Sequence, residues 1–91
     1  MPESIRREIG LELMRVQFGN QPKNFKSMPT VGAGAYEIRV REESGAYRAI
    51  YVAKFGAAVY VLHAFRKKTQ RTAKMDIELA KARYRMIGAK S

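Results

Sequence analysis

The chain has 91 residues, 46% of them hydrophobic, and it carries 18 Lys and Arg against 8 Asp and Glu, a formal net charge of +10. This length and apolar content suit one folded domain over residues 1–91 and exclude a disordered tail. The chain has no cysteine, which excludes disulfides and thiolate metal sites, and no apolar run approaches the roughly 20 residues that span a membrane. We therefore expect a cytoplasmic protein that does not associate with membranes and whose charge favours a polyanionic partner.

Residues 2–18 are predicted to form a helix. Their apolar side chains recur at helical spacing and Gly19 suits the helix end. The recurring residues are Ile5, Ile9, Leu13 and Val16. Residues 20–34 mix Pro, Gly and Asn, break both helical and strand periodicity, and are therefore predicted to form a loop.

Three strands are predicted in the middle of the chain. Residues 36–42 alternate between apolar and charged side chains, as in a half-buried strand. Residues 47–55 and 58–65 are rich in β-branched and aromatic side chains. Short turns at 43–45 and 56–57 would join the three strands into an antiparallel meander.

A second helix is predicted after the basic stretch that follows the last strand. Thr72 would cap it and Gly88 would end it, with an apolar stripe facing the sheet. The stripe consists of Ile77, Ala80, Tyr84 and Ile87. The predicted fold class is therefore α+β, a helix, a three-stranded antiparallel meander and a C-terminal helix, in which one sheet face is covered and the other is free.

Several basic residues are predicted to share one face of this sheet. With a hairpin loop over 43–46, Arg41 lies opposite Arg48, and a two-residue turn at 56–57 sets Ile50 opposite His63 and Arg48 opposite Phe65. The residues that then point the same way are Arg39, Arg41, Arg48 and His63. The core residues on the other face would be Ile38, Val40, Ala49, Tyr51, Tyr60 and Leu62. Because like charges across a sheet destabilise it, the arginines favour an anion-binding surface.

The remaining charges point to nucleic acid and not to a metal. Residues 63–91 carry nine basic and two acidic side chains, and so hold seven of the ten excess positive charges. His63 is the only histidine, and Asp76 and Glu78 face different ways on a helix, so no metal site is expected. The chain contains no P-loop and no dinucleotide-binding glycine pattern, and no cofactor or small-molecule ligand is expected.

Several segments resemble a known protein family. The resemblance lies in the segments 36–41, 45–52 and 59–72. The most specific of the three is 59–72, which contains His-Ala-Phe-Arg-Lys-Lys-Thr-Gln-Arg-Thr. Together they resemble the HigB-like, phage-derived branch of the RelE/ParE toxin superfamily over nearly the whole chain. The family usually begins with an edge strand, whereas this chain starts near the predicted helix, so the resemblance implies that the first strand is missing.

The resemblance implies the toxin of a type II toxin–antitoxin system. Such toxins inhibit translation as endoribonucleases that cleave mRNA, usually on the ribosome, without a metal, by attack of the ribose 2′-hydroxyl on the adjacent phosphate. They are silenced by a cognate antitoxin, here expected to be a helix-turn-helix protein. By the same resemblance Arg39 and Arg41 would hold the RNA backbone, Arg48 would stabilise the phosphorane, and Lys67 and Lys68 would occupy the basic position after the last strand.

The proton-transfer group stays open among Lys67, Lys68 and His63. A crowded cation cluster lowers the pKa of a neighbouring lysine, which favours the lysines, and His63 is the alternative base. Further RNA contacts are expected from Lys54, Arg66, Gln70, Arg71 and Lys74.

Three other functions are compatible with the sequence. The chain could bind RNA or the ribosome without cutting, it could resemble ParE and inhibit a DNA topoisomerase, or it could be an inert remnant. New 5′-hydroxyl RNA ends would indicate cleavage instead of binding alone. Ribosomal footprinting after induction would separate a block of translation from DNA damage, and growth arrest would exclude an inert remnant.

Overall fold

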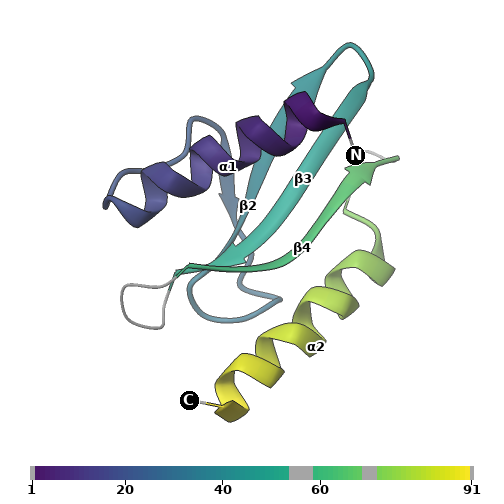
Figure 1. Ribbon diagram of the computed structural model, residues 1–91. Coiled ribbons are helices and arrows are strands. Elements are labelled where there is room, and N and C mark those ends of the chain that lie inside the picture. Colours follow the sequence, from purple (N-terminus) through teal and green to yellow (C-terminus); the bar gives the residue numbers. More distant parts are fainter. Residues whose placement is uncertain (1, 54–58, 69–71, 91) are drawn as a thin grey trace.

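The computed structural model describes residues 2–53, 59–68 and 72–90 (Figure 1). Within them one helix precedes an antiparallel sheet and a second helix follows it, which confirms the predicted α+β class. The elements are α1 (Glu3–Gln17), β1 (Phe25–Ser27), β2 (Ala35–Glu42), β3 (Gly45–Val52), β4 (Tyr60–Lys67) and α2 (Lys74–Lys90). The strands lie in the order β1-β2-β3-β4, so each pairs with its neighbour in the sequence.

Helix α1 forms where its apolar spacing predicts it. The predicted stripe packs against the sheet, and Ile5 and Ile9 are buried. The chain leaves the helix through Gly19, whose φ of 85° lies in the left-handed region that glycine adopts without strain. The predicted helix of residues 2–18 is therefore confirmed to within one residue at each end.

The sheet has a short edge strand that the sequence analysis did not predict. Residues 25–27 lie inside the predicted loop of residues 20–34 but pair with β2, Phe25 opposite Ile38. Their three residues are too few to show a period of two, which is why the pattern alone could not find them. Strand β4 also continues to Lys67, two residues beyond its predicted end, and the predicted turn at 56–57 lies outside the described residues.

The predicted register is partly confirmed. His63 lies opposite Ile50 and Phe65 opposite Arg48, as predicted. The first hairpin is tighter than predicted, however, because Glu42 pairs with Gly45, and the residue opposite Arg48 is therefore Arg39 and not Arg41. A shift of two residues keeps the side chains of β2 and β3 on their predicted faces.

Both faces of the sheet are covered, so the prediction of a free face was wrong. Helix α1 packs on the face of Ile38 and Ala49, whereas α2 packs on the face of Ile50. Neighbouring strand residues point to opposite faces, and the two helices therefore lie on opposite sides. In Figure 1, α1 crosses the strands β2 and β3 and α2 runs alongside β4.

Two residues predicted in the core of the α1 face lie elsewhere. A register shift between Ile50 and Tyr51 leaves Leu62 without a partner on β3. This bulge turns Leu62 into the cluster under α2, and Tyr60 beyond it is exposed.

Helix α2 presents the predicted apolar stripe to the sheet. It begins one residue later than a Thr72 cap requires, since the backbone amides of Asp76 and Ile77 both donate to the carbonyl of Ala73. The predicted stop at Gly88 was also wrong, because the helix continues to Lys90. Neither helix, among the described residues, is long and apolar enough to cross a bilayer.

Gly32 is required by the close approach of α2. A Cβ atom at this position would overlap the ring of Tyr84, whose hydroxyl donates to the carbonyl of Ala33 at 2.8 Å. We expect Gly32→Ala to lower the free energy of unfolding by about 1–3 kcal/mol, measured by urea denaturation, because the ring must move. Gly10→Ala is the matched control: a Cβ there meets nothing within 4 Å, and we expect it to stabilise α1 by about 0.5–1 kcal/mol. Equal effects of the two substitutions would contradict this account.

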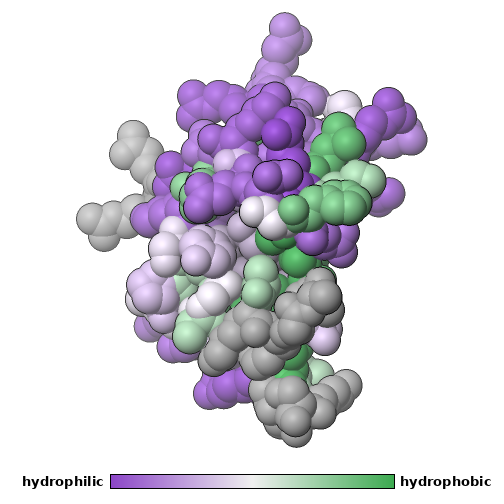
Figure 2. Space-filling view, turned by 90° about the vertical axis from the view of Figure 1, so that its left-hand side faces the viewer, coloured by the Kyte–Doolittle hydropathy of each residue, from purple (hydrophilic) through white to green (hydrophobic). Residues whose placement is uncertain are grey.

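The outer side of α1 exposes three large apolar side chains at helical spacing. They are Leu11, Met14 and Phe18, the last 78% exposed. Figure 2 views the side of the molecule at which α1 ends and shows apolar residues grouped along one side, among hydrophilic ones. A grouped apolar surface of this kind is typical of a protein–protein contact.

Candidate active site

Two arginines lie directly opposite each other on the sheet face that α2 covers. Arg39 of β2 pairs with Arg48 of β3. Arg48 is only 7% exposed, and its pKa is lowered chiefly by this burial and further by the positive charges of Arg39 and Arg41. Such a pair destabilises the sheet unless negative charge accompanies it.

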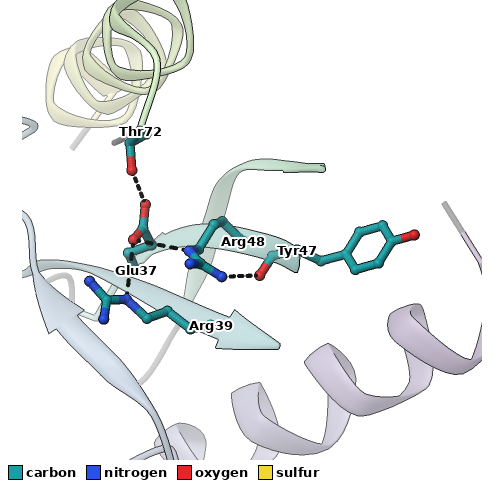
Figure 3. A network of polar contacts seen from close by, with 5 residues as sticks. All are labelled: Glu37, Arg39, Tyr47, Arg48 and Thr72. Carbon is teal, nitrogen blue, oxygen red and sulfur yellow. Dashed lines mark hydrogen bonds and ion pairs between the residues drawn. The ribbon is translucent and has the colours of Figure 1, made fainter. Parts of the chain in front are cut away.

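The compensating charge is Glu37, which lies between the two guanidinium groups (Figure 3). Its side chain is 1% exposed, and its Oε1 atom lies 3.6 Å from Nε of Arg48 and 3.7 Å from Nε of Arg39. Its Oε2 atom accepts a hydrogen bond of 2.7 Å from the Thr72 hydroxyl. The predicted helix cap Thr72 therefore joins the segment before α2 to the sheet instead.

The arginines keep unused donors in this arrangement. Distances of 3.6–3.7 Å are too long for hydrogen bonds, and the buried Nε atoms of Arg39 and Arg48 have no hydrogen-bond partner in the described part of the chain. Nη1 of Arg48 donates to the Tyr47 carbonyl at 3.0 Å. Buried donors without acceptors are costly, so the pair is suited to an anion that would accept from it.

Lys67 extends the cationic cluster. It ends β4, and its pKa is lowered, first by burial, then by the charge of Arg48, and also by those of Arg39 and Lys26, while Glu37 acts in the opposite direction. Burial therefore contributes more to the lowered pKa of Lys67 than the neighbouring charges on which the sequence-based prediction relied. Lys26, from the short strand β1, was not among the predicted site residues.

Two pockets open beside the arginine pair and share Arg39. The larger has a volume of about 380 Å³ and the smaller about 310 Å³. The larger is lined by Lys26, Ser27, Met28, Pro29, Thr30, Glu37, Arg39, Lys67, Thr72 and Ile77. The smaller is lined by Asn24, Arg39, Val40, Arg41 and Arg48, which places the exposed Arg41 next to the pair.

His63 is engaged with the second helix. Its Nε2 atom lies 2.7 Å from Oδ1 of Asp76, and its ring stacks on Phe65 with centroids 4.8 Å apart. Phe65 separates His63 from Lys67 along the strand. The histidine thus shares the face of the arginines but faces a carboxylate of α2.

The other predicted site residues lie around this cluster or away from it. Lys68 is exposed and borders, with Lys67, a further pocket near the start of α2. Arg66 points to the other face of the sheet from the arginine pair, and its partner across the strands is Tyr47. Its Nη2 donates to the Ser44 carbonyl at 2.6 Å. Lys74 is exposed at the first residue of α2. The predicted contacts Lys54, Gln70 and Arg71 lie outside the described residues.

Glu37, like Lys26, is a residue of the candidate site that the sequence analysis did not predict. It was predicted as one of the outward-facing charges of an alternating strand, yet it is buried. Its position two residues before Arg39 places both on one face, and this spacing is the signal that could have found it. Within the described ranges no group of three or more His, Asp or Glu side chains is placed to hold a metal ion.

Comparison with known proteins gives a family match. The model of the family described as phage derived protein Gp49-like (DUF891) matches residues 1–85. No curated protein and no solved structure matches the chain.

Proposed function

Because the chain belongs to the Gp49-like family of phage-derived proteins, a RelE-like toxin family, we propose that it is a type II toxin that cleaves mRNA. The observation that carries the proposal is the cluster of Arg48, Arg39 and Lys67 on one sheet face, in which the buried Nε atoms of both arginines have no hydrogen-bond partner among the described residues. Fixed cations of this kind stabilise the charge that develops on a phosphorane.

The proposed reaction is an internal transfer at one RNA phosphate. The ribose 2′-oxygen forms a bond to phosphorus while the bond from phosphorus to the 5′-oxygen breaks. The 2′-hydroxyl proton goes to a base on the protein, and the leaving 5′-oxygen takes up a proton. The products are a 2′,3′-cyclic phosphate and a 5′-hydroxyl end. Arg48 would contact the phosphorane oxygens, while Arg39 and Arg41 would hold the RNA backbone.

Lys67 is the best-supported proton acceptor among the three candidates. Its lowered pKa increases the fraction that is neutral near physiological pH, and only the neutral amine accepts a proton. His63 is less suited because Asp76 occupies its Nε2 atom. Lys68 is exposed and lies outside the two pockets that share Arg39.

We therefore expect cleavage by the wild-type protein to rise with pH towards the lowered pKa of Lys67 and then to level off. Lys67→Arg keeps the positive charge but cannot lose its proton, so it should cut about 10²–10⁴-fold more slowly and lose this pH dependence. Lys68→Arg is the control and should behave as the wild type in single-turnover assays across pH. If Lys68→Arg loses the pH dependence and Lys67→Arg keeps it, the assignment passes to Lys68.

The proposed partners are ribosome-bound mRNA and a cognate helix-turn-helix antitoxin, and the proposed place of action is the cytoplasm. The net charge of +10 supports a polyanionic partner. The exposed apolar stripe of Leu11, Met14 and Phe18 supports a contact with another protein, such as the antitoxin.

Induced expression tests the proposal in cells. We expect growth arrest together with new mRNA 5′-ends inside reading frames, and no damage to DNA. Growth arrest with DNA damage and intact mRNA would support the ParE-like alternative of a topoisomerase inhibitor. Arrest of translation with intact mRNA would support a module that binds RNA or the ribosome without cutting, an alternative favoured by the carboxylate of Glu37, which already faces the arginine pair.

A further inference from the structure

We infer that the larger pocket beside the arginine pair receives one base of the RNA, adjacent to the phosphate that is cut. This inference rests on the proposed function and specifies which part of the RNA, a single base, the site would recognise. The pocket volume of about 380 Å³ falls within the range of small-ligand sites, roughly 300–1,000 Å³.

The pocket combines two chemically different walls. One carries a net positive charge, because Lys26, Arg39 and Lys67 outnumber the single carboxylate of Glu37. The other is apolar and contains Met28, Pro29 and Ile77. A phosphate alone would use only the cationic wall. A nucleotide uses both, because its phosphate is anionic and its base has flat apolar faces.

The apolar wall is held in place before any ligand binds. The amide of Val31 donates to the Met28 carbonyl at 3.0 Å, which closes a turn with Pro29 at the second position, where proline is favoured. The amide of Met28 donates in turn to the Ala35 carbonyl at 2.9 Å, and the Met28 side chain is buried. A fixed wall can discriminate between bases, because a poorly fitting base cannot be accommodated by movement of the wall.

The hydroxyl groups of Thr30 and Thr72 also line the pocket. The Thr30 hydroxyl can donate to or accept from a base edge, whereas the Thr72 hydroxyl, which donates to Glu37, can accept from one. A base paired in a duplex has its edge occupied and cannot enter a concave pocket. The substrate that fits is therefore single-stranded RNA with one base turned out towards Met28 and Ile77.

Thr30→Trp tests this inference, because Thr30 is exposed at the pocket and a bulky side chain there would fill it. Cleavage of a randomised RNA pool is sequenced to give the base preference at each position around the cut. We expect the wild type to prefer particular bases at one flanking position, and Thr30→Trp to reduce that preference at least tenfold. Gln21→Trp, an exposed site in the loop after α1, is the control and should leave the preference unchanged.

A binding measurement separates the failure of this inference from the failure of the proposed function. Short oligonucleotides with 2′-deoxy substitution at the cut cannot be cleaved, and they are compared with the same strands lacking the base at the preferred position. Removal of the base should weaken binding to the wild type but not to Thr30→Trp, with Thr30→Tyr as a milder variant if the first one unfolds. If the wild type binds these strands with base selectivity but never cuts RNA, the nuclease proposal fails and the base pocket stands. An unchanged base preference in a folded Thr30→Trp, or equal binding of strands with and without the base by the wild type, would overturn the inference.

Discussion

Replacement of Arg48 by alanine is expected to slow RNA cleavage by about 10²–10³-fold, as removal of one charge-stabilising donor typically does. The same substitution should lower the free energy of unfolding by about 3 kcal/mol, at the low end for a broken buried ion pair. The destabilisation arises because Glu37 stays buried without its closest guanidinium, while Arg39 and Thr72 remain near it. Cleavage rates and urea denaturation measure the two effects.

A double variant separates the chemistry of Arg48 from its structural role. Replacing both members of a buried ion pair by apolar residues is often neutral for stability. We therefore expect Arg48→Met combined with Glu37→Leu to recover most of the stability that Arg48→Ala loses, and to remain inactive. Full cleavage by either Arg48 variant would refute the role assigned to this arginine.

Glu37→Gln is expected to lower the free energy of unfolding by about 3 kcal/mol, as removal of one partner of a buried ion pair typically does. The amide can still accept from Thr72 but no longer compensates Arg39 and Arg48. Because the charge of Glu37 raises the pKa of Lys67, its removal should lower that pKa further. The rising limb of the pH–rate profile should therefore move to lower pH.

Glu12→Gln is the matched control for this prediction. Glu12 is also buried, but it lies in α1 and accepts from the backbone amide of Lys23 at 2.8 Å. Its replacement should destabilise the fold while leaving the pH–rate profile where it is. If both variants shift the profile equally, or neither does, the electrostatic link between Glu37 and Lys67 is contradicted.

The elements with long periodic patterns could be predicted from the sequence. The stripe of Ile5 and Ile9 defines α1, and the stripe of Ile77 and Ala80 defines α2, because burial of one helix face requires this spacing. The face shared by Arg39 and Arg48 was also predicted, since it depends only on the alternation of strand residues.

What could not be predicted depends on contacts between distant parts of the chain. The bulge that moves Leu62 under α2 leaves no local signal, and neither does the three-residue strand β1. The burial of Glu37 depends on Arg48 and on Thr72, which is 35 residues away in the sequence. The covered second face follows from how both helices pack, because α2 carries enough apolar surface to require a sheet face of its own.

The chemical ends of the RNA products are the most direct evidence for or against cleavage by the ribose 2′-hydroxyl. The purified protein is incubated with a short single-stranded RNA in the presence of a metal chelator, and the products are identified by mass spectrometry. We expect fragments with a 2′,3′-cyclic phosphate and a 5′-hydroxyl, formed by the wild type and not by Arg48→Met with Glu37→Leu. Fragments that carry a 5′-phosphate, or RNA that stays intact both free and bound to ribosomes, would contradict cleavage by the 2′-hydroxyl at this cationic site.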